Sequence, residues 1–437
     1  DVMSLHAFTV HEIEDKIPLK VECIDVFHYH GKNKLVVGTL EGQLLLYDAS
    51  SKELKNMKQL QLAKKPITQL ATVEGHNLLL TLVDGLISVY ALPGVQPGSP
   101  LTVVKRSQGA TMFAVDWTQG TLRLAVALKT KKIVVFFWDA GLTEFVEKRE
   151  HNMADHAKSI TWLGENVVVG YTREYVTYIA KNSQLEDRTI EKGTTACAYL
   201  MPDGNVLEMH HATTALIFDP KTGKSVREGF GITFNDPPTS LTYSFPYVLA
   251  LTSKGVEIRP YFESNVLHQF IGLQQPKCLA SDSGHGTLQR RGQGIAYVAS
   301  RKGFWILQPV PLEEQVEALK RDDAHDQALV LCEAVTDEDL ANRVQLIADC
   351  KLRIAYRSYT NGVYPKAFKY FKDLSIDPLI LLGLFDNVVW VWSQGTPGGS
   401  SSAKQRSSLL PTPVQTLISR KLPLESAPVY NDTNFKK

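Results

Sequence analysis

Apolar residues recur along most of the chain as pairs of short runs separated by a polar turn. The second run usually ends in an aromatic or acidic residue, as in LVVGTLEGQLLLYD from Leu35. Seven copies of this pattern begin at Leu35, Leu78, Arg123, Asn166, Asn205, Tyr247 and Ile295. Their spacing of about 40–48 residues is the period of a four-stranded propeller blade, so each copy predicts two strands of one blade.

A second β-prone segment precedes each copy at a similar offset. These seven segments begin at Lys20, Pro66, Ala110, Ala157, Thr194, Pro238 and Pro276. They are rich in small residues, which suit strands that crowd a central channel, and we predict that they are the innermost strands. More polar fourth strands are expected at LTVVKRS, FVEKREH, SVREGFG and NVLHQFI, which begin at Leu101, Phe145, Ser225 and Asn265.

The seventh copy has no outer strand of its own, because the pattern becomes helical after Pro311. The segment His6–Asp15 precedes the first inner strand and belongs to no other blade. We predict that this segment supplies the missing strand, since closing the ring with both ends of the chain removes exposed sheet edges. The predicted fold class is therefore an all-β seven-bladed propeller over residues 4–311, with the ring closed by the N-terminal strand.

A helical region is expected from Leu312. The segments LEEQVEALKRDD and AHDQALVLCEAV predict a helical hairpin, with four inward apolar residues, Val316, Leu319, Ala328 and Leu331. A longer helix is expected from Thr336, because Thr336 and Asp339 resemble a capping box. Its apolar positions are Val344, Ile347, Ile354 and Ala355.

Two more helices are expected to begin at Pro365 and Pro378, since proline is favoured in the first helical turn. Residues 312–389 thus predict the first helices of an α-solenoid, which is incomplete because a solenoid needs several repeats and a polar cap. Residues 390–437 form a low-complexity tail. The segment 393–437 has six basic and two acidic residues, a net charge of +4, and we expect disorder there. A solvated linker is favoured over contact with an acidic lipid surface.

Net charge and cysteine usage exclude several classes of protein. The chain has 47 Lys and Arg against 46 Asp and Glu, so it shows no overall preference for nucleic acid or an anionic membrane, and we expect no nucleic-acid partner. The five cysteines form no CxxC pair, which fits a reducing intracellular compartment better than a disulfide framework. No secretory leader is expected, and the most apolar stretches are too short for a membrane span.

Motifs for phosphate binding fail when their full spacing is required. Gly223-Lys224-Ser225 matches the end of a P-loop, but Phe218 stands where the first glycine of that motif is needed. We predict a hairpin turn there instead. The glycine-rich segment Gly284–Gly294 is expected to be a mobile loop of blade seven, and its Arg290-Arg291 pair is either solvated or meets an acidic partner.

No catalytic, cofactor-binding or metal-ligating residue is nominated, and no cofactor is expected. The histidine pairs His28/His30 and His210/His211 favour structural or surface roles, and adjacent strand residues face opposite sides. No nucleophile elbow occurs, and no catalytic triad or carboxylate pair can be assigned from spacing. A propeller that leads into helices is more often an interaction platform than an enzyme, by analogy of fold. A propeller enzyme with a site in the central channel remains the alternative.

Several segments resemble one known family. They include KIPLKVECIDVF, KLVVGTLEGQLLLY, AKSITWLGENVVVGYTREYVTYI and, most specifically, Tyr247–Tyr261 and the YVAS…PVPLEEQ junction. These segments resemble the citron homology domain and following helices of the vacuolar protein sorting-associated protein 39 family. The resemblance covers about residues 3–385. The segments from Met3 and Leu312 also resemble the TGF-β receptor-associated protein 1 family, which ranks second.

The resemblance implies a subunit of the HOPS tethering complex, which binds a late-endosomal Rab GTPase and brings membranes together before fusion with the vacuole or lysosome. The implied partners are that GTPase and other HOPS or CORVET subunits, through which the chain associates peripherally with the late-endosomal or lysosomal membrane. The second family implies a CORVET-like tether of early endosomes. A third hypothesis, the citron homology region of a signalling kinase or exchange protein, usually accompanies a catalytic module that this sequence lacks.

The sequence departs from the family after Phe385. Family members continue through a long α-solenoid to a cysteine-rich zinc-binding segment, whereas no CxxC follows here. We therefore expect a fragment or an atypical end. The family has no short catalytic motif, so no site residue is transferred from it.

Overall fold

The computed structural model describes residues 6–13, 20–49, 54–92, 94–117, 120–178, 187–219, 221–227, 231–262, 268–282, 294–301, 303–377 and 381. The chain divides into two compact units between Gln315 and Val316.

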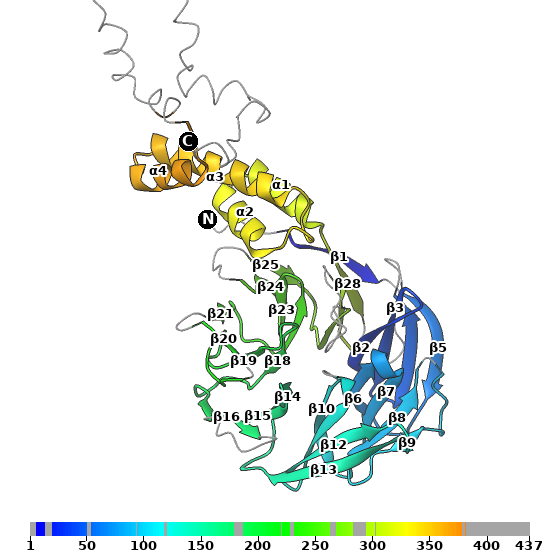
Figure 1. Ribbon diagram of the computed structural model, residues 1–437. Helices are drawn as coiled ribbons and strands as arrows, with labels where there is room; N and C mark the ends of the chain where they lie inside the picture. The colour runs from blue at the N-terminus through cyan, green and yellow to red at the C-terminus, as the bar shows by residue number, and fades with distance from the viewer. Residues whose placement is uncertain are drawn as a thin grey trace, which may run out of the picture. The chain divides into compact units, whose positions relative to one another are not determined.

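In the first unit, the described residues form 28 strands in seven four-stranded antiparallel sheets (Figure 1). Blade one contains β2 (Val21–Tyr29), β3 (Lys32–Thr39), β4 (Gln43–Asp48) and β5 (Lys55–Gln61). Blade two contains β6 (Ile67–Val73), the 3₁₀ turn η1 (Glu74–His76), β7 (Leu78–Val83), β8 (Leu86–Ala91) and β9 (Thr102–Val103). Blade three contains β10 (Ala110–Asp116), β11 (Arg123–Leu128), β12 (Lys132–Asp139) and β13 (Glu144–Asn152).

The remaining four blades repeat this order. Blade four contains β14 (Ser159–Leu163), β15 (Asn166–Gly170), β16 (Glu174–Tyr178) and β17 (Arg188–Thr189). Blade five contains β18 (Ala198–Leu200), β19 (Val206–Met209), β20 (Thr214–Phe218) and β21 (Ile232–Thr233). Blade six contains β22 (Ser240–Ser244), β23 (Tyr247–Thr252), β24 (Gly255–Pro260) and β25 (Gln269–Gly272). Blade seven contains β26 (Cys278–Ser281), β27 (Ala296–Ala299), β28 (Phe304–Pro309) and β1 (Phe8–Ile13).

The ring is closed by strands from both ends of the propeller sequence. Strand β1 pairs antiparallel with β28, from Phe8 opposite Pro309 to Ile13 opposite Phe304, and is the outer strand of blade seven. Each inner strand contacts the next around the ring, in the order β2, β6, β10, β14, β18, β22, β26 and back to β2. The predicted seven-bladed propeller is confirmed.

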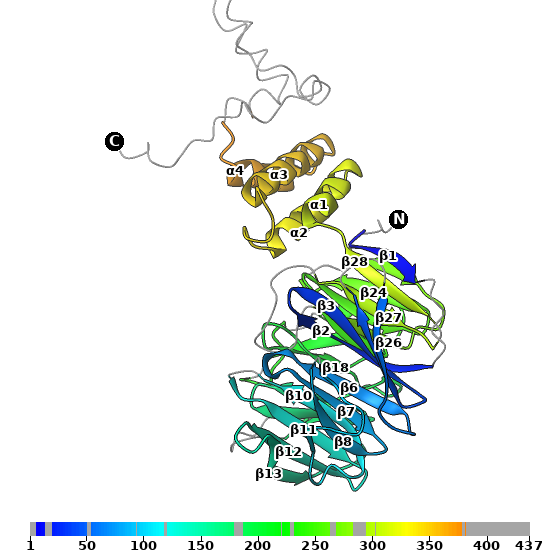
Figure 2. The same ribbon diagram turned by 90° about the vertical axis from the view of Figure 1, so that its right-hand side faces the viewer.

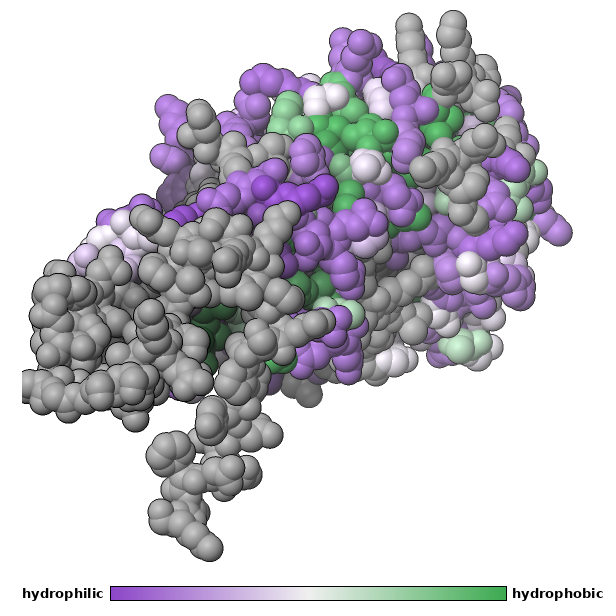
Figure 3. Space-filling view, turned by 90° about the horizontal axis from the view of Figure 1, so that it is seen from above, coloured by the Kyte–Doolittle hydropathy of each residue, from purple (hydrophilic) through white to green (hydrophobic). Residues whose placement is uncertain are grey.

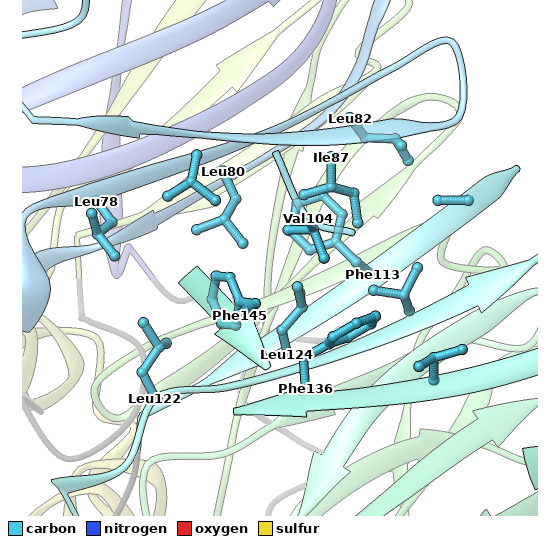
Figure 4. Close-up of a cluster of buried hydrophobic side chains, with 14 of the residues drawn as sticks. Leu78, Leu80, Leu82, Ile87, Val104, Phe113, Leu122, Leu124, Phe136 and Phe145 are labelled. Carbon is cyan, nitrogen blue, oxygen red and sulfur yellow. The ribbon is translucent and has the colours of Figure 1, made fainter. Parts of the chain in front are cut away.

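The middle strands of the blades are apolar at nearly every position because both of their faces are covered by neighbouring blades. All six residues of β11 and of β23 are buried. Between blades two and three, Leu80 and Ile87 pack toward Phe113, Leu124 and Phe136 (Figure 4). Each such side chain contributes about 1.5–3 kcal/mol on burial, so packing between blades is a main source of stability.

Three of the four predicted outer strands are confirmed, as β9, β13 and β25 overlap the expected segments. The prediction for SVREGFG is wrong, because β21 begins later, at Ile232, and pairs with the start of β20. Ser225 makes only one isolated bridge, to Phe218. The Val226 amide donates to the Ile217 carbonyl oxygen at 2.8 Å, and the outer strand of the sheet starts only at Ile232.

Four helices follow the propeller in the described part of the chain, as expected. They are α1 (Leu312–Arg321), α2 (His325–Ala334), α3 (Arg343–Thr360) and α4 (Tyr364–Asp373). Helix α3 contacts both α2 and α4 (Figure 2). All four residues predicted to point inward from the first hairpin are buried, at Val316, Leu319, Ala328 and Leu331. Ala355, Ala367 and Phe371 form the small core between α3 and α4.

The helix predicted from Thr336 begins instead at Arg343. The Asp339 carboxylate accepts hydrogen bonds from the Thr336 amide at 3.0 Å and hydroxyl at 2.6 Å, but these close a turn. Asn342 has a φ of 55°, in the left-handed region, which separates this turn from the helix. Val344, predicted to point inward, is 69% exposed because it lies in the first turn of the shortened helix. The helix predicted at Pro378 and the tail at 390–437 lie outside the described residues.

The surface seen in Figure 3 is mostly hydrophilic, with apolar side chains gathered in smaller areas. No helix among the described residues is long and apolar enough to cross a membrane.

Candidate functional site

The centre of the propeller contains a cavity of about 280 Å³ that is lined by the inner strands of all seven blades. Most of its lining is apolar or small, as the inner-strand sequences suggested. The polar lining residues are Asp25, Gln69, Thr72, Asp116, Thr161, Tyr199 and Thr242. An enzyme with a site in the channel would use such residues as its catalytic groups. Their hydrogen-bond partners therefore show whether they are available for catalysis or hold the structure together.

Asp25 joins blade one to blade two. One of its carboxylate oxygens accepts hydrogen bonds from the Thr72 amide at 2.6 Å and the Thr72 hydroxyl at 2.9 Å. The other oxygen accepts from the Val26 amide at 2.9 Å. Since the carboxylate already has three protein donors, it acts as a link between inner strands.

Asp116 is bound by Arg123 on the next strand of the same blade, with Arg123 Nε at 3.0 Å. The guanidinium also donates to the Gly164 carbonyl oxygen at 2.9 Å and lies 4.6 Å from the ring centroid of Trp162. The Trp162 indole in turn donates to the Ala114 carbonyl oxygen at 3.1 Å. Ion pair, cation–π contact and hydrogen bonds together connect blade three to blade four.

Other inner-strand side chains form similar links to the backbone of a neighbouring blade. The Gln69 amide donates to the Phe113 carbonyl oxygen at 2.6 Å and accepts from the Phe113 amide at 3.0 Å. The Cys278 thiol donates to the Glu22 carbonyl oxygen at 3.1 Å. The Ser281 hydroxyl donates to the Tyr243 carbonyl oxygen at 2.6 Å. Burial raises the pKa of Tyr199, which disfavours the phenolate that a base would need. The channel groups therefore serve to hold the ring together.

A second buried polar cluster lies between blades four and five. The Arg188 guanidinium donates to the two Glu208 carboxylate oxygens at 2.8 Å and 2.7 Å, and to the Thr177 hydroxyl at 3.1 Å. His210 places one ring nitrogen 3.1 Å from Glu208 and the other 2.9 Å from the Thr189 carbonyl oxygen. Glu208 is fully buried, so this cluster joins blades and is closed to a ligand.

The histidines paired in the sequence lie in different surroundings in the structure. His210 is buried beside Glu208, whereas the side chain of His211 is 58% exposed and lies 3.1 Å from Glu191, so the two rings face opposite sides as predicted. His28 Nδ1 lies 3.0 Å from the Asn33 side-chain oxygen. Among the described residues no three His, Cys, Asp or Glu side chains are arranged to hold a metal ion.

The Gly-Lys-Ser sequence is a hairpin turn, as predicted. The Asp219 carboxylate accepts from the Lys221 amide at 2.9 Å and from the Thr222 hydroxyl at 3.0 Å. Gly223 has a φ of 65°, and its amide donates to the Asp219 carbonyl oxygen at 2.9 Å. Residues 283–293 of the predicted glycine-rich loop, with Arg290 and Arg291, lie outside the described residues.

The buried ion pairs were missed by the sequence interpretation. A signal existed, because charged residues stand in strands that are otherwise mostly apolar: Arg123 begins β11, Glu208 lies within β19, and Glu257 and Arg259 lie within β24. Arg259 Nε donates to Glu257 at 2.7 Å, and Glu257 accepts from the Asn235 amide at 2.8 Å. A charged residue within an apolar strand indicates a buried partner.

Comparison with known proteins gives consistent results. A family model for the CNH (citron homology) domain matches residues 31–282. The Vam6/Vps39-like protein of Homo sapiens is 28% identical over 416 residues, which is 88% of this chain and 43% of that protein. Vacuolar sorting protein 39 of Arabidopsis thaliana is 25% identical, covering 87% of this chain and 37% of that protein.

Transforming growth factor-beta receptor-associated protein 1 of Homo sapiens is 24% identical, covering 88% of this chain and 45% of that protein. The chain thus spans less than half the length of these relatives, and both resemblances stated from the sequence are confirmed. A solved structure described as the AfRom2 CNH domain superposes with a TM-score of 0.49 and 18% identity, covering 69% of this chain and 98% of that one.

Proposed function

The chain belongs to the CNH domain family, and on that premise we propose that it is a non-catalytic interaction subunit of a HOPS-like membrane-tethering complex. The observation that carries the proposal is the similarity to Vps39 proteins across 88% of the chain, through the propeller and into the helices. These relatives are named for vacuolar sorting, which supports a role in vacuolar or endosomal protein sorting.

The finer part of the proposal concerns partners. The propeller binds a Rab GTPase of the late endosome or vacuole, and the helices belong to an α-solenoid that joins other tether subunits. Through these partners the chain associates peripherally with late-endosomal and lysosomal membranes and promotes fusion with the vacuole or lysosome. The proposed organisation is a propeller over residues 4–311, solenoid helices over 312–389 and a tail over 390–437.

A non-catalytic role is supported by the use of polar groups at the centre of the ring. Asp25, Gln69 and Asp116 are engaged by donors and acceptors of their own or neighbouring blades. Such a ring is rigid, and its loops offer a large preformed surface, which favours recognition with little rearrangement on binding.

Capture of purified Rab GTPases by the immobilised chain tests the proposal. Each Rab is offered loaded with GDP and with a GTP analogue, so that every GTPase is its own control. We expect selective capture of a late-endosomal Rab in the GTP-analogue state. Capture that ignores the nucleotide, or capture of no Rab at all, contradicts the Rab-binding proposal.

A CORVET-like role at early endosomes is the second candidate. It is favoured by the match to human TGF-β receptor-associated protein 1, which covers 88% of the chain at 24% identity. The same Rab panel separates the two candidates, because a CORVET-like subunit should select an early-endosomal Rab.

A further inference from the structure

The antiparallel order of the strands assigns every connection of the propeller to one of two faces. In each blade, two connections lie at the end of the sheet where the inner strand begins. One is the turn between the second and third strands, and the other leads from the fourth strand to the next blade. The inner strands run in the same direction, because links such as Cys23 to Ile67 and Cys278 to Glu22 join residues near the starts of neighbouring strands. Connections of this kind from all blades therefore share one face.

Charge is distributed unequally between the two faces. We define the basic face as Lys20 and the described residues of 40–42, 62–66, 84–85, 104–109, 129–131, 153–158, 171–173, 190–197, 210–213, 234–239, 253–254, 273–277 and 300–303. It has thirteen Lys and Arg residues against five Asp and Glu residues, a net formal charge of +8. The described connections of the opposite face have three basic and six acidic residues, a net charge of −3.

Five of the thirteen basic residues are neutralised by nearby carboxylates. Lys105 and Arg106 pair with acidic residues of β13 at 2.6 Å, and Lys131 pairs with Asp155 at 3.2 Å. Lys254 pairs with Asp236 at 2.8 Å, and Lys277 pairs with Glu22.

Eight basic residues remain, all exposed and without an ion pair among the described residues. They are Lys20, Lys64, Lys65, Lys129, Lys158, Arg173, Lys192 and Arg301. They belong to blades seven and one and to blades three and four, and blade two between them presents only the ion-paired Lys105 and Arg106. Of the acidic residues on this face, Glu41 and Asp84 also have no ion pair within the described residues. The excess positive charge is therefore spread over four of the seven blades, on both sides of blade two.

From this geometry we propose that the basic face docks directly on an anionic lipid bilayer. Six of the eight residues are lysines, and each lysine places a point charge on a flexible stem. Such side chains suit a surface of diffuse negative charge better than they suit a ligand that needs paired hydrogen bonds in a shaped pocket. Their spread over several blades matches a broad surface. None of the exposed large apolar residues found in the structure lies in the connections of this face, so the contact is electrostatic and does not insert into the acyl region.

This docking goes beyond the proposed function, in which partners provide the membrane association. It also differs from what the overall net charge of +1 indicates. A Lys or Arg near an anionic bilayer contributes roughly fivefold to the binding constant, so several such residues give measurable binding without a protein partner.

Flotation with protein-free vesicles tests the inference on the full chain. We expect binding to phosphatidylcholine vesicles that contain phosphatidylserine, no binding to pure phosphatidylcholine, and loss of binding as salt shortens the Debye length. Soluble glycerophosphoserine should not compete, because a single headgroup lacks the extended charge. Competition at low concentration would point to a headgroup pocket and overturn the bilayer assignment.

Two matched double variants locate the surface. Lys64→Glu/Lys65→Glu reverses two charges on the basic face, and Lys221→Glu/Lys224→Glu reverses two exposed charges on the opposite face. We expect the first variant to bind at least about tenfold more weakly and the second to bind like the parent chain. Circular dichroism checks that both remain folded.

Three results overturn the proposal: no binding to anionic vesicles, equal weakening by the two variants, or binding that is removed only by Lys404→Glu/Arg406→Glu in the tail. Capture of acidic proteins or nucleic acid in place of vesicles assigns the face to a different partner and likewise overturns it. Because the vesicles carry no GTPase, this outcome is independent of the Rab experiment.

Discussion

Replacing Arg188 with methionine tests whether the buried ion pairs between blades stabilise the propeller. The side chains of Arg188 and Glu208 are 8% and 0% exposed, and they are joined by two charge-assisted hydrogen bonds. Methionine keeps much of the length and apolar stem of arginine but leaves the Glu208 carboxylate with His210 as its remaining described side-chain partner. The substitution also removes the cation–π contact with Phe218, whose ring centroid lies 5.0 Å away.

The expected loss follows from the burial of Glu208. Removing one partner of a buried ion pair typically costs about 3–5 kcal/mol, because an uncompensated charge stays in a low-dielectric site. The matched control is Lys254→Met, which breaks the ion pair with Asp236 at 2.8 Å. Lys254 is 66% exposed, so solvent screens that pair and the expected loss is below about 1 kcal/mol.

Urea denaturation followed by tryptophan fluorescence measures both losses. The double variant Arg188→Met/Glu208→Gln removes the stranded charge while keeping an acceptor for His210. We expect it to be at least about 2 kcal/mol more stable than Arg188→Met alone, since the penalty comes from the unpaired carboxylate. This reasoning is refuted if Arg188→Met loses no more stability than Lys254→Met. It is also refuted if the loss of the double variant equals the sum of the losses of Arg188→Met and Glu208→Gln measured separately.

Two further predictions concern backbone and thiol groups. Gly42 and Gly31 both have a φ near 75°, but a Cβ on Gly42 would lie 2.3 Å from the Ala63 carbonyl oxygen, whereas Gly31 has nothing within 4 Å. Thermal denaturation should therefore show about 1 kcal/mol lost in Gly31→Ala and clearly more in Gly42→Ala, and equal losses would contradict the close approach. Burial raises the pKa of all five cysteines. The rise is smallest for Cys332, whose pKa is about 11. At pH 8 the thiolate fraction of Cys332 is about a hundredfold below that of a free thiol. Iodoacetamide should therefore modify the cysteines of the native chain correspondingly slowly, and faster as the pH rises. A cysteine that reacts as fast as a free thiol contradicts this prediction.

The middle strands could be predicted from the sequence because packing between blades imposes one environment on them. Strands β11 and β23 are covered on both faces, so every position is apolar or has a buried partner, and the pattern repeats in each blade. The inner strands were also found, since small residues there follow from crowding at the axis. The repeat and its period therefore fix both the fold class and the blade number.

The outer strands were harder to predict because an edge strand has one pairing partner and needs few residues. Strands β9, β17 and β21 contain two residues each, too short for any periodicity. Ser225 illustrates the result: SVREGFG has β-prone residues, but its described part forms only an isolated bridge to Phe218, and the outer strand starts at Ile232. The predicted start of α3 was wrong for a related reason. Hydrogen bonds of the kind that Thr336 and Asp339 make can cap a helix, but they can also close a simple turn.

The partners of buried charges also could not be read from the sequence. Arg188 and Glu208 lie on different blades, and their pairing depends on how neighbouring sheets face each other. The sequence marks Glu208 as unusual within its apolar strand, but Arg188 lies in a strand of two residues, and spacing alone does not say which base meets which acid.

The two faces of the propeller show why a net charge near zero is a poor guide to electrostatic partners in this fold. Each blade sends alternate turns to opposite faces, so a lysine moved from one turn to the next changes face while the composition stays the same. The same formal charge of +1 is therefore compatible with a basic face of +8 or with none. Lys64→Glu/Lys65→Glu and Lys221→Glu/Lys224→Glu have identical net charge, and if net charge governed association they would bind anionic vesicles equally. A difference between them can arise only from the positions that the strand order assigns to these four lysines.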